Sequence, residues 1–262
     1  MKIVVFASGS GGNCMLLSDG DTHLLIDAGI SMRRIESSLA HAGLTVNDIA
    51  GVLITHEHAD HISGLGMLLK HFALTVYAPH TVAARLCGML PAAVDRLHVI
   101  PVGECFSVGG VRVRAFHTPH DTDESVGYRV EGEGCFALAT DMGEVTDEVL
   151  DGLLGADTVL IESNHDIGML VDGGYPFHLK RRILSSHGHL SNVDCAQLAL
   201  RLVREGTGTV ILGHLSRENN RPELALAESS RLIADSGAEL CCAPVFGWLE
   251  REVKKLPCCT SN

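Results

Sequence analysis

Short apolar stretches separated by small and polar residues open the chain. Residues 2–8, 14–18 and 23–27 are such stretches, and Gly, Ser, Asn and Asp are frequent in the segments between them. Strand-length apolar runs bounded by turn-forming residues are typical of β-structure. The sequence therefore predicts three consecutive strands, paired as an antiparallel meander.

The spacing of the hydrophobic positions changes after residue 30. From Ser31, a residue type favoured at helix N-caps, apolar residues recur with a helical period until Gly43, and residues 51–55 (GVLIT) then form an apolar strand. Helical and extended segments go on alternating after this point. We expect helices at 64–72, 81–90, 147–154, 193–204 and 223–234, and strands at 74–78, 97–101, 158–163 and 210–215.

Residues 105–141 return to strands, with a hairpin at Gly109-Gly110 and apolar runs at 126–130 and 135–141. Residues 164–192 are expected to be rich in loops. Strands followed by alternating strands and helices, twice over, place the chain in the α/β class. No repeat or proline-rich linker interrupts the pattern, so we expect one domain over residues 1–256 and a short tail at 257–262.

Composition indicates a soluble chain. Hydrophobic residues make up 46% of it, and no run approaches the ~18 consecutive apolar residues of a membrane-spanning helix. The first residues lack the apolar core and cleavage site of a signal peptide, and the nine cysteines include no CxxC spacing. We therefore expect a cytoplasmic protein without membrane attachment, whose cysteines are reduced.

The formal net charge of −12 counts against a protein that wraps nucleic acid by non-specific attraction, because such proteins are usually basic. Any contact with phosphate must therefore be local. Two bound divalent cations would add positive charge at one point and still leave the whole surface acidic.

A cluster of metal-binding residue types follows the predicted strand at 51–55. It reads His56-Glu57-His58-Ala59-Asp60-His61. Histidines two residues apart on an extended segment point to the same side, and Asp60 and His61 then turn toward a second point at the start of a helix. Three imidazoles and a carboxylate exceed what one tetrahedral zinc ion needs from a single loop, which favours a binuclear site.

The segment THEHADH at 55–61 resembles the signature motif of the metallo-β-lactamase superfamily. The resemblance implies a four-layer αββα sandwich in which Asp27 has a structural role at the end of the third strand. It also implies a hydrolytic reaction in which a hydroxide that bridges two metal ions is the nucleophile. The two divalent ions would be zinc or manganese, with iron as a further option.

The same resemblance implies the remaining ligands. Later strand ends should supply a histidine, an aspartate and a final histidine, and His120, Asp141 and His214 stand at these places. One ion would then be bound by His56, His58 and His120, and a second by Asp60, His61 and His214, with Asp141 bridging them. His117 competes with His120, since both follow the strand VRVRAF, and the family's HD before VGY favours His120.

Four further segments resemble the WalJ/YycJ group of bacterial metallo-hydrolases, which are described as 5′-to-3′ DNA exonucleases. They are ASGSGGN at 7–13, ESNHD at 162–166, GHLSN at 188–192 and GHLSRENN at 213–220. The likeness runs over nearly the whole length, and the acidic segment 121–125 and the tail depart from it. It implies DNA as substrate, with RNA in second place. Asp60 and Asp141 would position the ions and the hydroxide, and His189 would orient the phosphate or protonate the leaving oxygen.

The same segments indicate where a phosphate would bind. Ser191 and Asn192 are N-cap candidates beside His189, so the free N–H groups of the next helix are available to a terminal phosphate. The full set of phosphate-binding candidates is His189, Ser191, Asn192, Ser216, Asn219 and Asn220. Ordinary helix capping is the structural alternative. Residues 8–13 are similarly either an anion-binding nest or a tight turn, and Lys180-Arg181-Arg182 is either a phosphate-binding patch or a solvated helix face.

Two other functions stay open on the sequence alone. A small-molecule thioester or lactone hydrolase of the glyoxalase II type would use the same metal site and need no basic cluster. A non-enzymatic regulator that keeps the metal for structure is disfavoured, because every expected ligand position is filled. The oligomeric state is left open.

Overall fold

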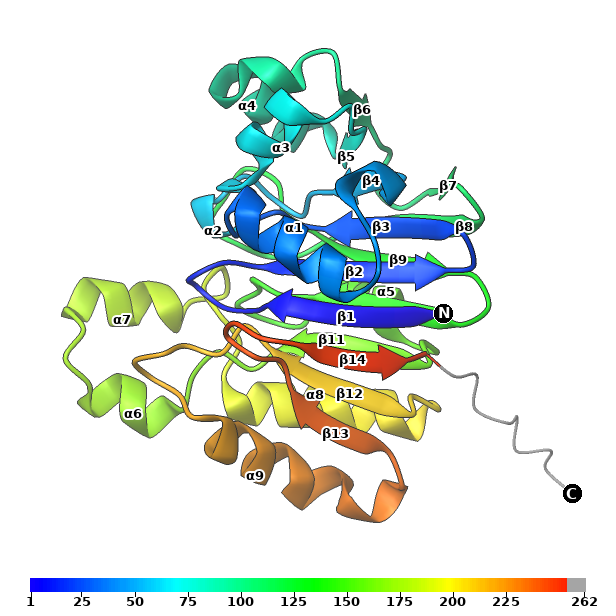
Figure 1. The fold of residues 1–262 in the computed structure, drawn as a ribbon. Helices are drawn as coiled ribbons and strands as arrows, with labels where there is room; N and C mark the ends of the chain where they lie inside the picture. Colours follow the sequence, from blue (N-terminus) through cyan, green and yellow to red (C-terminus); the bar gives the residue numbers. More distant parts are fainter. Residues whose placement is uncertain (254–262) are drawn as a thin grey trace, which may run out of the picture.

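Within residues 1–253, which the computed structural model describes, two seven-stranded β-sheets form the centre of the fold (Figure 1). The first sheet has the strand order β14-β1-β2-β3-β4-β5-β6, and the second has the order β13-β12-β11-β10-β9-β8-β7. Each sheet joins an antiparallel part to a parallel part. This arrangement matches the expectation of strands followed by strand–helix units, twice over.

The first sheet contains the N-terminal strands and the last strand of the described chain. Its members are β1 (Lys2–Ala7), β2 (Cys14–Asp19), β3 (Thr22–Ile26), β4 (Gly51–Leu53), β5 (Val76–Ala78), β6 (Leu97–Val99) and β14 (Leu249–Glu252). Strands β1, β2 and β3 pair antiparallel, so the predicted meander is confirmed. Strands β4, β5 and β6 then continue the sheet in parallel.

The second sheet repeats this organisation. Its members are β7 (Cys105–Val108), β8 (Val111–His117), β9 (Val126–Glu131), β10 (Cys135–Ala139), β11 (Thr158–Glu162), β12 (Thr209–Gly213) and β13 (Glu239–Cys242). Strands β7 to β10 pair antiparallel, and β11 to β13 add in parallel. The predicted ligands follow β4, β8, β10 and β12, and the ends of these strands meet at one edge of the sandwich.

Helices cover the outer faces of the sheets. The first sheet carries α1 (Met32–His41), α3 (Leu65–His71) and α4 (His80–Met89), and the second carries α5 (Asp147–Leu153), α8 (Asn192–Arg204) and α9 (Pro222–Ile233). In β1, Ile3 and Val5 lie in the core between the sheets, whereas Val4 and Phe6 lie in the core under the helices. Burial of both faces explains the nearly continuous apolar runs. The predicted four-layer αββα sandwich is confirmed.

A hydrogen bond between the sheets fixes the segment that leads into the histidine-rich motif. The hydroxyl of Tyr128 on β9 donates to the carbonyl of Ile54, just beyond β4, at 2.7 Å, and both groups are buried. The backbone N–H of Val126 donates to the carbonyl of Thr55. The approach to His56 is therefore braced by the opposite sheet.

The expectation of loops at 164–192 is wrong in part, because two short helices form there. They are α6 (Ile167–Asp172) and α7 (Phe177–Ile183), of six and seven residues. Neither is long enough to show a full apolar stripe, so periodicity does not reveal them. A local signal does exist for α6, since the Asp166 side chain caps it by accepting the N–H of Met169 at 2.8 Å.

The edge strands β13 and β14 have no counterpart among the predicted elements, being four residues each with mixed polarity. In the described part of the chain, no helix is both long enough and apolar enough to span a bilayer. The predicted tail at 257–262, the end of the predicted domain and Cys258 and Cys259 lie outside the described residues.

Candidate metal centre

The residues predicted as metal ligands gather at one edge of the sandwich. Four of them, His56, His58, Asp60 and His61, lie between β4 and the end of the short helix α2 (Ala59–Ile62). The others follow strands of the second sheet, and they are His120 after β8, Asp141 after β10 and His214 after β12. The carboxyl ends of these strands meet at one edge, so residues far apart in sequence converge there.

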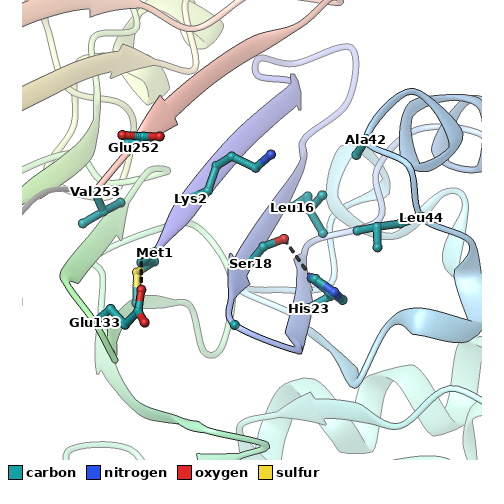
Figure 2. Close-up of a pocket in the computed structure, with 11 residues that line it drawn as sticks. Met1, Lys2, Leu16, Ser18, His23, Ala42, Leu44, Glu133, Glu252 and Val253 are labelled. Carbon is teal, nitrogen blue, oxygen red and sulfur yellow. Dashed lines mark hydrogen bonds and ion pairs between the residues drawn. The ribbon is translucent and has the colours of Figure 1, made fainter.

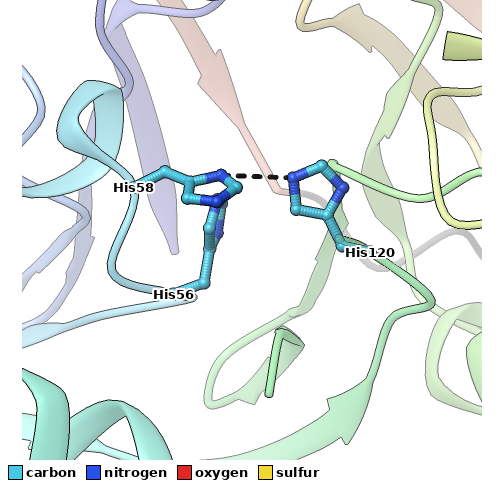
Figure 3. Close-up of side chains that lie close together, drawn as sticks. All are labelled: His56, His58 and His120. Atoms are coloured by element: carbon cyan, nitrogen blue, oxygen red, sulfur yellow. Dashed lines mark hydrogen bonds between the residues drawn. The ribbon is translucent and has the colours of Figure 1, made fainter. Parts of the chain in front are cut away.

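Three histidines form the first group of donors (Figure 3). His56 and His58 approach from the loop after β4, and His120 faces them from the loop after β8. Nε2 of His120 lies 3.3 Å from Nδ1 of His58. One ring nitrogen from each residue lies within 4.8 Å of the other two. Three imidazoles in this arrangement suit one divalent ion and leave a coordination position open.

Asp60, His61 and His214 form the second group of donors, again within 4.8 Å of one another. Oδ2 of Asp60 lies 3.6 Å from Nε2 of His61 and 3.6 Å from Nε2 of His214. Asp141 stands between the two groups. Its Oδ1 lies 3.8 Å from Nε2 of His120, and its Oδ2 lies 3.3 Å from Nε2 of His61. A carboxylate in this position is placed to bridge two ions.

The second nitrogen of each of three rings is held by a protein oxygen. Nδ1 of His61 lies 2.7 Å from Oδ2 of Asp27, and Nδ1 of His214 lies 2.8 Å from Oε1 of Glu162. Nδ1 of His56 lies 3.1 Å from the hydroxyl of Thr55. Such contacts fix the ring orientation and direct Nε2 into the centre, as outer partners do in metal sites. Asp27 thus has the structural role that the resemblance implies.

Buried ring nitrogens without a hydrogen-bond partner indicate whether these residues fit a metal ion. Nε2 of His56 and Nε2 of His214 are buried and make no hydrogen bond within the described chain. Buried polar atoms are rarely left without a partner, because each one loses its hydration on burial. A divalent cation between the two groups would satisfy both nitrogens. The residues therefore fit divalent metal binding.

The pKa values of several site residues are shifted because imidazoles and carboxylates are buried next to one another. Burial lowers the pKa of His61, but the carboxylates of Asp27 and Asp141 outweigh it and raise that pKa to about 10. Burial raises the pKa of Glu162, but His189 and His214 outweigh it and lower that pKa to about 2. Carboxylates thus stay ionised in the interior because positive charge lies beside them. A bound cation would take over this role from the ring protons.

Backbone conformation at the strand ends is unusual in the same place. Among the described residues, Asp27, Asp141 and His214 are the non-glycine residues with positive φ, at 58°, 56° and 53°. Each follows the end of a strand, respectively β3, β10 and β12. Left-handed conformations cost about 1 kcal/mol or more for residues with a Cβ. They cluster at functional sites, where the backbone must hold a side chain in one particular direction. The sheets hold all three turns at the donor cluster.

Glu162 belongs to the site, although no motif in the sequence marks it as a member. It is fully buried at the end of β11, and Oε1 lies 2.8 Å from Nδ1 of both His189 and His214. Its Oε2 accepts the backbone N–H of Met142 at 2.9 Å. The available signal is its position, since an acidic residue ends an apolar strand in the same way as the predicted ligand Asp141 ends another.

The loop at 8–13 braces the cluster. The hydroxyl of Ser8 accepts the backbone N–H of His214 at 2.8 Å, and Nδ2 of Asn13 lies 3.0 Å from Nε2 of His61. Asn13 also accepts the N–H of Gly9 through its side chain. These contacts favour the tight-turn alternative over an anion-binding nest.

His117 and His120 have different surroundings. The side chain of His120 is 2% exposed and faces His58, whereas that of His117 is 52% exposed and lies beside Glu148 and Glu124. The geometry therefore brings His120 into the donor cluster and leaves His117 outside it.

The predicted phosphate-binding residues lie in three different surroundings. His189 lies at the cluster, with its ring 5.4 Å from that of His214 and 22% of its side chain exposed. Ser191 caps α8, and Asn192 and Asn220 are hydrogen-bonded to each other. The hydroxyl of Ser216 accepts the N–H of Asn219, whose own Nδ2 is buried without a hydrogen bond in the described chain. Internal bonding favours a structural role for Ser191, Asn192 and Asn220.

A separate surface hollow of about 530 Å³ lies at the other end of β1 (Figure 2). Met1, Ser18, His23 and Glu133 are among its lining residues, and the Ser18 hydroxyl lies 2.9 Å from Nδ1 of His23. Its lining residues belong to none of the His, Cys and acidic groups in the described chain that are spaced to hold an ion. In the described chain, the residues that are spaced to hold a metal ion therefore lie at the donor cluster and not at this hollow.

Comparison with known proteins connects this site to a family. Residues 22–215 match the family model described as the beta-lactamase superfamily domain. The chain is 38% identical over 237 residues to exodeoxyribonuclease YycJ of Bacillus anthracis, with 89% of each protein covered. It is 39% identical over 228 residues to exodeoxyribonuclease WalJ of Streptococcus pneumoniae, with 86% of this chain and 85% of the relative covered.

A solved structure supports the fold independently. The metallo-beta-lactamase fold protein YhfI of Bacillus subtilis matches with a TM-score of 0.73 over 95% of this chain and 99% of its own. At 17% identity this likeness shows the fold alone.

We predict that His120→Ala loses metal and that His117→Ala does not, because the cluster contains only the first of these rings. The measurement is the metal content per protein, determined after dialysis, with circular dichroism to verify folding. A metal equivalent lost from His117→Ala and retained by His120→Ala would reverse this assignment.

We also predict that Glu162→Gln weakens metal binding about 10- to 100-fold, as expected when an outer partner of a ligating histidine is removed. An amide side chain has one oxygen, so it cannot accept from both His189 and His214 and also from Met142. The affinity is measured by competition with a chelating dye. Glu148→Gln, which alters an exposed carboxylate beside His117, is the matched control. Equal affinities for wild type and Glu162→Gln would contradict the positioning role.

Proposed function

The chain belongs to the metallo-β-lactamase superfamily, and on that premise we propose that it is a metal-dependent phosphodiesterase that degrades DNA from the 5′ end. Support for the substrate comes from the two relatives named exodeoxyribonuclease, each at least 38% identical over most of both chains. Support for the chemistry comes from the geometry. Two groups of donors flank one buried carboxylate, which suits a hydrolytic site with two ions.

In this proposal one ion is held by the three histidines of the first group, and the other by the second group, with Asp141 between them. Zinc and manganese both suit imidazole and carboxylate donors, as does iron. When bound, two such ions supply a hydroxide nucleophile at neutral pH and neutralise charge on the phosphoryl oxygens. Asp60 and Asp141 hold the donor geometry from opposite sheets.

His189 is the side chain that we assign to the phosphate. Nδ1 lies 2.8 Å from Oε1 of Glu162, so this nitrogen is occupied and Nε2 remains for a ligand. The ring also lies 5.2 Å from that of His120. A group at this position can donate to a phosphoryl oxygen or deliver a proton to the leaving oxygen. Glu162 orients the ring for either task.

We predict that the protein loaded with zinc or manganese releases mononucleotides from the 5′ end of labelled DNA, and that chelation abolishes the activity. Labelled duplex DNA, single-stranded DNA, RNA, a thioester and a lactone are compared in parallel, with His58→Ala and Asp60→Ala as inactive controls. Faster cleavage of the thioester or lactone, with DNA left intact, would favour the small-molecule hydrolase instead. A preference for RNA would replace the DNA assignment.

We further predict that a 5′-phosphorylated strand is degraded faster than a 5′-hydroxyl strand, and that His189→Ala shrinks this preference. A charge-assisted contact contributes about 1.5–3 kcal/mol, which corresponds to roughly 10- to 150-fold in rate if it is expressed in the transition state. A small chromogenic phosphodiester, having no such terminus, should lose comparatively little.

His187→Ala is the matched control, since this exposed histidine lies on the same loop. Equal loss of both activities in His189→Ala would assign His189 to the chemical step. No change in either activity would exclude it from the phosphate pocket and direct attention to Ser216 and Asn219.

A further inference from the structure

The helices α6 and α7 stand out from the sandwich on the side of α2 and the donor cluster (Figure 1). We call residues 167–183 the arm. The arm presents apolar side chains to solvent, and Ile167 is 44% exposed, Val171 54% and Phe177 75%. Among the described residues, Phe177 is the most exposed large hydrophobic side chain. Several exposed apolar side chains on one segment are typical of a surface that binds a ligand with an apolar face.

The end of α7 is fixed directly to the donor cluster. The backbone N–H of His189 donates to the carbonyl of Ile183 at 3.0 Å. A Cβ at Gly188 would lie 2.2 Å from the carbonyl oxygens of Arg182 and Ile183, so the loop passes α7 in close contact. Arg182 pairs with Asp121, whose Oδ1 lies 3.1 Å from Nε2 of His120. The position of the arm relative to the cluster is therefore set by short contacts.

The helix that carries Phe177 also carries three positively charged side chains. Lys180, Arg181 and Arg182 fill the last turn of α7, whereas the acidic residues of the arm and its cap are Asp172 and Asp166. Lys180 donates to the carbonyl of Val171, and Arg182 is paired with Asp121. Within residues 1–253, the guanidinium of Arg181 makes no hydrogen bond or ion pair and is exposed. An aromatic ring four residues from an unpaired guanidinium matches the chemistry of single-stranded nucleic acid.

We propose that the arm grips the DNA strand, with Phe177 stacking on a base and Arg181 contacting a backbone phosphate. This inference rests on the proposed function and adds the residues that engage the polymer. Phe177 and Ile183 stand at opposite ends of a seven-residue helix, about 9 Å apart along an axis that rises about 1.5 Å per residue. That span equals two or three stacked base steps at about 3.4 Å each. The stacked base therefore lies a few nucleotides from the cleaved bond.

A second copy of this chain is the competing occupant of the same surface. In a twofold interface the same patch faces itself, so two arms would bring Lys180, Arg181 and Arg182 of both copies together. DNA instead supplies negative charge opposite these cations and a flat apolar surface opposite Phe177. Charge complementarity therefore favours the nucleic acid.

Substitutions at Phe177 test the stacking contact. In the metal-loaded enzyme we expect Phe177→Ala and Phe177→Leu to raise the KM for a single-stranded oligonucleotide about 5- to 100-fold, the range for loss of one base–aromatic stack. Phe177→Trp should restore a low KM. The rate with a small chromogenic phosphodiester should stay within about twofold throughout. Met89→Ala, which removes a side chain 55% exposed on α4, is the control.

Arg181 provides an independent test. The affinity for DNA falls as the salt concentration rises. We expect Arg181→Ala to make this dependence shallower, reducing the magnitude of the slope of log affinity against log salt concentration by about one, as for loss of one phosphate contact. Arg204→Ala, at the far end of α8, should leave the slope unchanged.

The outcomes separate this inference from the function it rests on. Wild-type protein that degrades no nucleic acid overturns both. Wild-type protein that degrades DNA, with KM unchanged in Phe177→Ala and Phe177→Leu, overturns the arm alone. Leucine acting as well as phenylalanine, equal loss of the small diester, or light scattering that shows a dimer lost in Phe177→Ala would each overturn it as well.

Discussion

Two buried carboxylate–histidine pairs are the interaction on which this site depends. Asp27 holds His61 from the first sheet, and Glu162 holds His214 from the second. Breaking a buried pair by removing one partner costs about 3–5 kcal/mol, because the remaining charge stays desolvated. The pairs also leave Nε2 of both histidines facing the same space. Each pair therefore both stabilises a strand end and orients a ligand nitrogen.

This requirement explains the backbone around the cluster. Asp27, Asp141 and His214 adopt left-handed conformations that residues with a Cβ usually avoid. Such turns persist because the surrounding sheets determine them more strongly than local preference does. Ser8 accepts the N–H of His214 across the two sheets, and Tyr128 holds the carbonyl of Ile54. The core thus supplies the rigidity that a metal site with fixed donor positions needs.

Local patterns in the sequence predict the α/β class and the cluster at 56–61, whereas the four-layer sandwich and the later ligands are implied by the resemblance to the metallo-β-lactamase superfamily. Apolar runs mark the strands, and polar residues at their ends mark the edge where His120 and Asp141 converge. The sequence does not reveal Glu162 as a partner of two histidines, since only the folded chain brings residues 162, 189 and 214 together. It also misses α6 and α7, whose lengths of six and seven residues are too short for a periodic signal.

The net charge of the chain describes its whole surface, whereas phosphate binding depends on the charges near one site. A charge of −12 argues against attraction of a polyanion to the whole surface. At physiological ionic strength, however, exposed charges farther than about 8 Å are largely screened. In the proposed function, a phosphate at the cluster would therefore respond mainly to its neighbours, which are the bound divalent ions and the cations of α7. Acidic residues farther away than this are largely screened, so a net charge of −12 is compatible with a local phosphate contact. The charges at this edge of the sandwich therefore bear on phosphate binding more directly than the net charge of the whole chain does.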